Sequence, residues 1–261
     1  ALLRDSARGC SRVARFYGTA FIDDEPAIVM KRYPGSLHKF LSSFPQRRPP
    51  LSLALDLCYQ IICCVEEIHA LGIAHRDLKP LNVLIDTANM AVLGDFGLGK
   101  ELAQTGSMRS THGHAPMGTP HYMSYEAFTG GKVGPEADVW SFGAVAFETI
   151  CGAPPFFRNE NGTLNYHAIY HEIVSGHIPP ELADDSVFPA AIATLLRASL
   201  AKDASVRPTA KALREGWADA TAALEPEWKS LHVAVEYVPS WGIWEGLREV
   251  DANGGFEPTA A

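Results

Sequence analysis

The sequence lacks the marks of a membrane-spanning or secreted protein. No apolar run approaches the roughly 20 residues that a bilayer-spanning helix needs, and the N-terminal residues ALLRD do not resemble a secretory signal. Cysteine is scarce: there are five in 261 residues, and three of them, Cys58, Cys63 and Cys64, fall in one apolar stretch. An odd number grouped in this way argues against a disulfide framework, so we interpret these thiols as small core residues. The expected location is cytoplasmic, in a reducing compartment.

Positive charge is also in short supply. Thirty acidic residues outnumber 22 lysines and arginines, giving a formal net charge of −8 and a pI near 5.7. Surfaces that bind nucleic acid are usually basic, so we expect no nucleic-acid partner. The recurring Arg4, Arg8, Arg12 and Arg15 are interpreted as the solvated face of a helix. With 47% hydrophobic and 20% charged residues, the composition is that of a folded globular protein.

The first fifty residues predict strands followed by a short helix. Residues 13–33 contain two apolar stretches around an acidic turn at 23–26, which indicates two short strands. Ser36 is a candidate N-cap for a helix that extends to Phe44. The prolines of residues 45–50 then form a linker that no helix could cross.

Beyond this linker the pattern is mainly helical. Apolar residues recur at three- and four-residue intervals over 51–71, which predicts a long amphipathic helix that Gly72 ends. Short strands are expected within 73–85 and 91–93, on either side of a loop. Further helices are predicted at 137–151, 164–175, 189–200 and 208–223. The fold class is therefore α+β with a mainly helical body.

Two short motifs carry most of the recognisable chemistry. The sequence HRDLKPLN begins at His75, and the sequence DFG begins at Asp95. Together they supply a carboxylate that can orient and deprotonate a hydroxyl (Asp77), a cation that can neutralise a phosphate (Lys79), and two magnesium ligands (Asn82 and Asp95). A DFG sequence alone is weak evidence, but the two motifs in this order and at this spacing are specific.

These motifs are similar to the catalytic loop and the metal-binding loop of eukaryotic-type protein kinases. Several further motifs extend the resemblance over about residues 1–222. It implies a two-lobe kinase fold with an incomplete small β lobe at 1–33 and a mainly α-helical large lobe at 34–222. Residues 223–261 lie outside the family pattern and form an extension of unknown role.

The resemblance implies an activity, two cofactors and a set of site residues. A serine/threonine protein kinase transfers the γ-phosphoryl group of ATP to a protein hydroxyl, with Asp77, Lys79 and Asn82 as the catalytic residues. The cofactors are ATP and Mg²⁺, and the metal ligands are Asn82 and Asp95. In the family pattern Met30 guards the adenine pocket, Arg32 lies in the hinge and Leu84 forms the pocket floor. The residues assigned to ATP are Met30, Arg32, Leu84, Lys79, Asn82 and Asp95.

Other positions match structural parts of the family. Residues 118–123 (GTPHYM) resemble the substrate-docking loop, in which Thr119 would bond the catalytic aspartate and lysine. This threonine and the catalytic-loop lysine are together typical of serine/threonine kinases. Asp138 matches the helix aspartate that holds the catalytic loop. Arg207 matches the partner of Glu126, although SYE stands at 124–126 where the family usually has APE.

The glycine-rich loop, the strand lysine and the helix glutamate of the family cannot be located in this sequence. We therefore expect this chain by itself to bind ATP poorly and to be an N-terminally truncated piece of an active kinase. The alternative is a non-catalytic, kinase-like docking or scaffold module. The intact catalytic residues favour the first interpretation.

The segment after Asp95 is expected to be a switch. An upstream activating kinase is a candidate partner, and Arg76 would receive the added phosphate charge. The candidate hydroxyls are those of Thr105, Ser107, Ser110 and Thr111.

Two metal-site hypotheses and a second nucleotide motif carry less weight. His112, His114 and His121 are better explained as part of a solvated loop, and His167 with His171 as core or surface histidines. Residues 241–253 are faintly similar to a nucleotide-binding helix of the gyrase and Hsp90 ATPases, but packing against the body or disorder is the preferred explanation.

Overall fold

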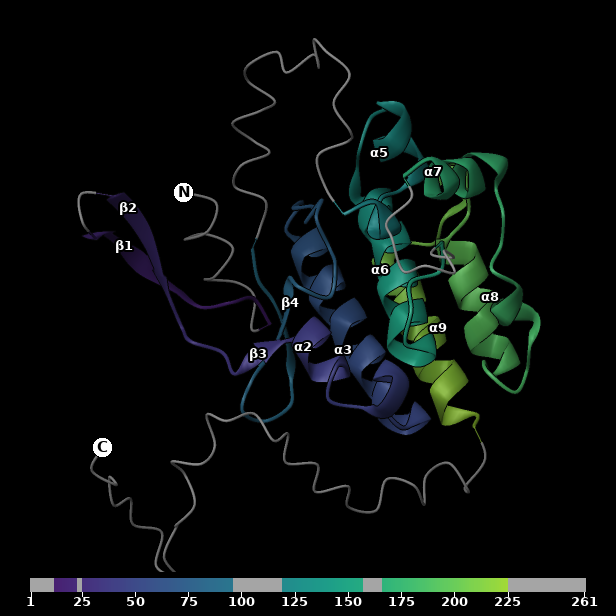
Figure 1. Cartoon of the computed structure of the whole chain (residues 1–261), viewed down its shortest axis with the longest axis horizontal. Helices are drawn as coiled ribbons and strands as arrows, with labels where there is room; N and C mark the ends of the chain where they lie inside the picture. Colours follow the sequence, from purple (N-terminus) through teal and green to yellow (C-terminus); the bar gives the residue numbers. More distant parts are fainter. Residues whose placement is uncertain (1–11, 23–24, 96–118, 157–165, 225–261) are drawn as a thin grey trace, which may run out of the picture.

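The computed structural model describes residues 12–22, 25–95, 119–156 and 166–224. In these residues two antiparallel sheets lie on one side of a helical body, as Figure 1 shows. Strands β1 (Phe16–Ile22) and β2 (Glu25–Met30) form a hairpin that projects from the body. Strands β3 (Gly35–Ser36), β4 (Val83–Ile85) and β5 (Ala91–Leu93) form the second sheet, in which β4 is central. The architecture confirms the predicted α+β class.

A short extended segment joins the hairpin to the second sheet. Val13 forms a parallel bridge with Leu93, whose backbone accepts a hydrogen bond from Ala14 N (2.7 Å) and donates one to Arg12 O (2.9 Å). Arg12 and Arg15 are not helical, so the helix expected at the N-terminal arginines is wrong for these two residues. The acidic turn is also shorter than predicted, because β2 already begins at Glu25.

Local capping defines the first two helices. The side chain of Ser36 accepts a hydrogen bond from Lys39 N (3.4 Å) and caps α2 (Leu37–Leu41), which ends three residues before the predicted end. A short 3₁₀ helix, η1 (Pro45–Arg47), occupies the proline linker. Helix α3 (Leu51–Ala70) ends as expected at Gly72, with φ 73°. Gly72 N donates to His69 O and Ile73 N to Ile68 O, the hydrogen bonds of a Schellman motif.

The remaining predicted helices are present, and their described bounds differ from prediction by at most two residues. Helix α5 was not predicted, because five residues are too few to show a helical period. The helices are α5 (Tyr125–Thr129), α6 (Pro135–Cys151), α7 (Tyr166–Ser175), α8 (Ala190–Ser199) and α9 (Ala210–Ala222). Of three further 3₁₀ segments, η2 (Pro120–Tyr122) precedes α5, η3 (Pro180–Ala183) lies between α7 and α8, and η4 (Ala204–Val206) lies between α8 and α9.

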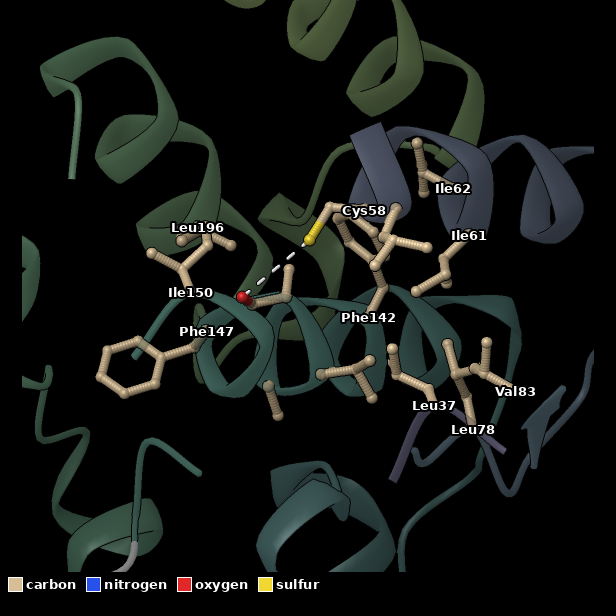
Figure 2. Close-up of a cluster of buried hydrophobic side chains, with 14 of the residues drawn as sticks. Leu37, Cys58, Ile61, Ile62, Leu78, Val83, Phe142, Phe147, Ile150 and Leu196 are labelled. Atoms are coloured by element: carbon tan, nitrogen blue, oxygen red, sulfur yellow. Dashed lines mark hydrogen bonds between the residues drawn. The ribbon is translucent and has the colours of Figure 1, made fainter. Parts of the chain in front are cut away.

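Helix α6 is the centre of the core. It packs between α3 and α8, and nearly all of its side chains are buried. Figure 2 shows Phe142 and Phe147 of α6 among apolar residues of α3, α8 and the second sheet. Cys58 of α3 points at the backbone of α6, with its Sγ 4.0 Å from Ala146 O. This arrangement confirms that Cys58 is a core residue, and burial raises the pKa of its thiol.

None of the described helices has both the length and the apolar character needed to cross a membrane.

Candidate active site

The HRDLKPLN segment is a loop between α3 and the second sheet. Its end is fixed by β4, and Asn82 O accepts a hydrogen bond from Gly94 N (2.8 Å) just after β5. A side chain at Gly94 would collide with Leu84, because a Cβ atom there would lie 2.8 Å from Leu84 Cδ1. The hydrogen bond from Gly94 places this residue, which precedes Asp95, beside Asn82, although Asn82 and Asp95 are 13 positions apart in the sequence.

The three predicted catalytic residues form a single hydrogen-bonded cluster. Lys79 Nζ lies 2.8 Å from Asp77 Oδ2, and Asn82 Nδ2 donates to the same oxygen at 3.1 Å. Asn82 Nδ2 also donates to the backbone oxygen of Asp77 at 2.8 Å. Asp77 and Lys79 are about one-fifth exposed, whereas Asn82 is buried. The cluster therefore holds a carboxylate and an ammonium group at a partly exposed position.

The buried Asp138 of α6 holds the backbone of this loop, as predicted. Its Oδ1 accepts from Arg76 N (2.7 Å), and its Oδ2 accepts from His75 N (2.7 Å). The ring of His69 lies 2.8 Å from the same Oδ2. Arg76 has a left-handed φ of 62°, which costs about 1–2 kcal/mol for a residue with a Cβ. Hydrogen bonds to a buried carboxylate, each about 1.5–3 kcal/mol, offset that strain.

The candidate nucleotide residues lie at the end of β2, just after it, and in β4. Met30 ends β2 and is 42% exposed, and Arg32 follows it in an exposed segment without regular secondary structure. The chain then enters β3, where Ser36 pairs with Leu84 of β4. Met30 and Arg32 thus lie five and three positions before the strand that pairs with β4. Their contact with a nucleotide stays a prediction.

The Glu126–Arg207 pair is present and is buried. Arg207 Nη1 and Nη2 donate to the two carboxylate oxygens of Glu126, each at 2.8 Å, and the Arg207 side chain has no exposure. Burial alone would raise the pKa of Glu126, but the hydrogen bonds and charge of Arg207 lower it below its ordinary value. The replacement of the family's usual APE by SYE has therefore not removed this tether. The bond from Thr119 to the catalytic pair stays a prediction.

Some important residues of the region were not found from the sequence. Glu148 of α6 is 3% exposed, and it accepts hydrogen bonds from Arg47 Nη2 (2.7 Å) and Tyr122 OH (2.5 Å). Ser141 Oγ donates to Tyr122 O at 2.8 Å. No motif pointed to these contacts, because Arg47 and Glu148 are 101 residues apart.

Several predicted residues lie outside the described part of the chain. These are Phe96, Gly97, Gly118, the four candidate phosphorylation sites between 105 and 111, His112, His114 and residues 225–261. His121 is described, and burial lowers its pKa. His167 and His171 are exposed, which agrees with surface histidines. In the described ranges, no three or more His, Cys, Asp or Glu residues form a group that could hold a metal ion.

Comparison with known proteins identifies the family. The family model described as "Protein kinase domain" matches residues 2–217. The chain belongs to the protein kinase family. This kinase domain is 34% identical over 202 residues to serine/threonine-protein kinase MRCK gamma of Homo sapiens, a match that covers 75% of the chain and 12% of that protein.

Two further relatives of the kinase domain differ in length. Serine/threonine-protein kinase Nek9 of Mus musculus is 37% identical over 199 residues, covering 76% of the chain and 19% of that protein. The probable cAMP-dependent protein kinase catalytic subunit of Encephalitozoon cuniculi (strain GB-M1) is 32% identical over 170 residues, covering 65% and 49%. The matched stretch is therefore less than half of each of these three relatives.

Proposed function

We propose that this kinase domain transfers the γ-phosphoryl group of ATP to a serine or threonine hydroxyl of a protein substrate. The observation that carries the proposal is the cluster of Asp77, Lys79 and Asn82 on a loop held by the buried Asp138. Two of the relatives above are named serine/threonine-protein kinases, which supports the class of acceptor. Activity of the whole protein, its substrate and its partners are part of this proposal.

Each residue of the cluster has a role that follows from its chemistry. Asp77 would orient the acceptor hydroxyl and accept its proton. Lys79 would place positive charge beside the transferring group, where negative charge spreads over the phosphoryl oxygens. Asn82 holds Asp77 through two hydrogen bonds and so limits the directions in which the carboxylate can point. The cluster would therefore act mainly by position and electrostatic field.

Asn82 and Asp95 are the residues that would hold magnesium. Among the described residues, the Asn82 side chain makes its two hydrogen bonds through Nδ2, so its amide oxygen is the atom that would meet a cation. Mg²⁺ usually takes only one or two carboxylates from the protein and completes its shell with water and phosphate oxygens. The small donor set fits this preference. Bound magnesium would neutralise charge on the phosphates of ATP.

The nucleotide assignment extends the proposal to the strand ends. Met30, Arg32 and Leu84 would surround the adenine, an assignment supported by the short connection from β2 to β3 and by the β3–β4 pairing. Lys79, Asn82 and Asp95 would then face the phosphates.

The test is phosphate transfer from γ-labelled ATP by the 261-residue chain and by any longer product that contains it. Asp77→Asn is expected to lower kcat by about 10²- to 10⁴-fold, because it removes the general base. Asp86→Asn is the matched control. Asp86 is half-buried in the β4–β5 turn, where its Oδ1 accepts hydrogen bonds from Ala88 N and Met90 N, outside the cluster. Unchanged turnover by Asp77→Asn would contradict the assignment.

A magnesium titration of nucleotide binding separates the metal ligand from the base. Asp95→Asn is expected to raise the magnesium concentration needed for binding, whereas Asp77→Asn should leave it nearly unchanged. Equal magnesium dependence in the two variants would show that this division of roles is wrong.

A further inference from the structure

A buried carboxylate on α6 joins two surface segments that the proposed mechanism does not use together. Glu148 Oε1 accepts a hydrogen bond from Nη2 of Arg47, which lies in the loop before α3. Glu148 Oε2 accepts one from the hydroxyl of Tyr122. Burial and the adjacent Glu148 charge raise the pKa of Tyr122, so its hydroxyl remains a donor. Ser141 holds the backbone oxygen of the same tyrosine. Tyr122 is thus fixed to α6 at both its side chain and its backbone.

The loop that supplies Arg47 is strained and firmly held. Gln46 and Arg47 have left-handed φ angles of 52° and 60°, which side chains with a Cβ rarely adopt. Arg48 Nε donates to Cys151 O at 2.6 Å. Gly152 lets the loop approach the end of α6, because a Cβ atom there would lie 2.2 Å from Gln46 O. Strain of this kind persists only where the surroundings fix it, and it is common at functional sites.

We propose that Arg47 is a positioning residue for the protein acceptor and acts through Glu148 and Tyr122. The docking segment, residues 119–123, would present the acceptor to Asp77, and Arg47 holds the Glu148 carboxylate where Tyr122 can bind it. Arg47 touches neither ATP nor the reacting atoms in this scheme. The inference rests on the proposed function, since positioning of an acceptor has meaning only if transfer takes place.

The Arg47–Glu148 ion pair is half-buried. Arg47 is 30% exposed, whereas Glu148 is 3% exposed, and Arg47 Nη1 donates to Ser42 Oγ at 3.0 Å. Loss of Arg47 would leave the buried carboxylate with one partner fewer, so the pair also contributes to stability. The backbone strain at Gln46 and Arg47 opposes that gain. A positioning role predicts, in addition, a loss of acceptor kcat/KM in variants that remain folded.

The decisive experiment is a double-mutant cycle with the full chain or a longer product that contains it, with myelin basic protein as the acceptor. Arg47→Met is expected to lower kcat/KM for the acceptor about tenfold and to leave KM for ATP unchanged. Tyr122→Phe should have a similar effect, because it removes only the hydroxyl that Glu148 binds. In the Tyr122→Phe background, Arg47→Met should cost little more. Equal, multiplying losses in both backgrounds would overturn the proposal.

Two controls test position separately from charge and folding. Arg47→Lys keeps a cation that can reach Glu148 and is expected to restore most of the acceptor kcat/KM. Arg48→Met removes the neighbouring arginine, whose side chain donates to Cys151 O rather than to Glu148. In the Arg48→Met background, Tyr122→Phe should lower the acceptor kcat/KM by the same factor as in the natural protein. If Arg47→Lys is as impaired as Arg47→Met while folding normally, the positioning role is wrong.

Hydrogen exchange separates this inference from the proposed function. Arg47→Met is expected to speed amide exchange at Tyr122 and Met123, whose N–H groups bond within the docking segment to Thr119 O and Pro120 O. Arg48→Met should not. If Arg47→Met speeds exchange at Tyr122 and Met123 but the protein transfers no phosphate, the proposed function is refuted, while the structural link from Arg47 to Tyr122 is supported. Unchanged exchange in an active kinase would refute the positioning role alone.

Discussion

Removal of Arg207 tests whether the activation-segment tether stabilises the large lobe. All five N–H groups of its guanidinium are used. Two bind Glu126, and the others donate to the backbone oxygens of Ala201, Glu136 and Lys202. Arg207→Ala therefore leaves a carboxylate and three carbonyl groups without this partner. One substitution thus removes contacts with α5, with α6 and with the segment between α8 and η4.

The burial of the pair sets the expected magnitude. Breaking a buried ion pair by removing one partner typically costs about 3–5 kcal/mol, because the remaining charge is left in a poorly solvated site. The Arg207 side chain has no exposure and Glu126 is 12% exposed, so the buried estimate applies. At about 2–4 °C per kcal/mol for a chain of this size, the unfolding midpoint should fall by roughly 6–20 °C.

The assay is thermal and urea unfolding of the two single variants and the double variant. Once Arg207→Ala has removed the pair, adding Glu126→Ala should cost little more, giving a coupling energy of order 1–3 kcal/mol. Arg214→Ala is the matched control, since Arg214 pairs with Glu66 at a site where both side chains are 26% exposed. That variant should lose less than about 1 kcal/mol.

The pH dependence provides a second measure of the same pair. Because the pKa of Glu126 is lowered from 4.5 in the folded state, its contribution is complete above pH 4.5. The contribution is lost as pH falls through the lower, folded-state pKa. The stability difference between the natural protein and Glu126→Gln should therefore shrink below pH 4.5. Two results together would refute the reasoning: small, additive losses of stability in Arg207→Ala and Glu126→Ala, and a stability difference between the natural protein and Glu126→Gln that does not shrink below pH 4.5.

Three further predictions concern the catalytic loop, the core and the strained loop. Asp138→Asn should lower both kcat and the unfolding midpoint, because its amide group cannot accept all the hydrogen bonds that the carboxylate receives; enzyme assays and calorimetry check this. Burial raises the pKa of Cys64 from 9.0 to about 12. Alkylation of this thiol at pH 8 should therefore require unfolding, which mass spectrometry measures. The free energy of unfolding should fall as pH rises above 9, which unfolding curves at several pH values measure. Gly152→Ala should lower the free energy of unfolding by about 2–5 kcal/mol, because φ is 82° and the new Cβ would clash with Gln46 O. Gly130→Ala is the control: φ is 74°, but no atom lies within 4 Å of a Cβ there, so the cost should be only about 1–2 kcal/mol. Urea unfolding measures both.

The sequence by itself determined the family, the fold class and the order of most elements. These features depend on information that lies close together along the chain. Helix α3 followed from a regular apolar period and from Gly72, whose missing Cβ permits the left-handed C-terminal turn. Asp77, Lys79 and Asn82 lie within six residues, so their cluster could be expected from the motif. The long-range pair of Glu126 and Arg207 was expected only because of the family resemblance.

The tertiary structure alone decided which distant groups share a buried partner. No local pattern links Arg47 to Glu148, or His69 to Asp138, since these contacts depend on how α3, α6 and the loop before α3 pack. A carboxylate inside a helix looks the same in sequence whether it faces water or the core. Burial makes the difference, because a charge removed from water must find its hydrogen-bond partners wherever the fold brings them.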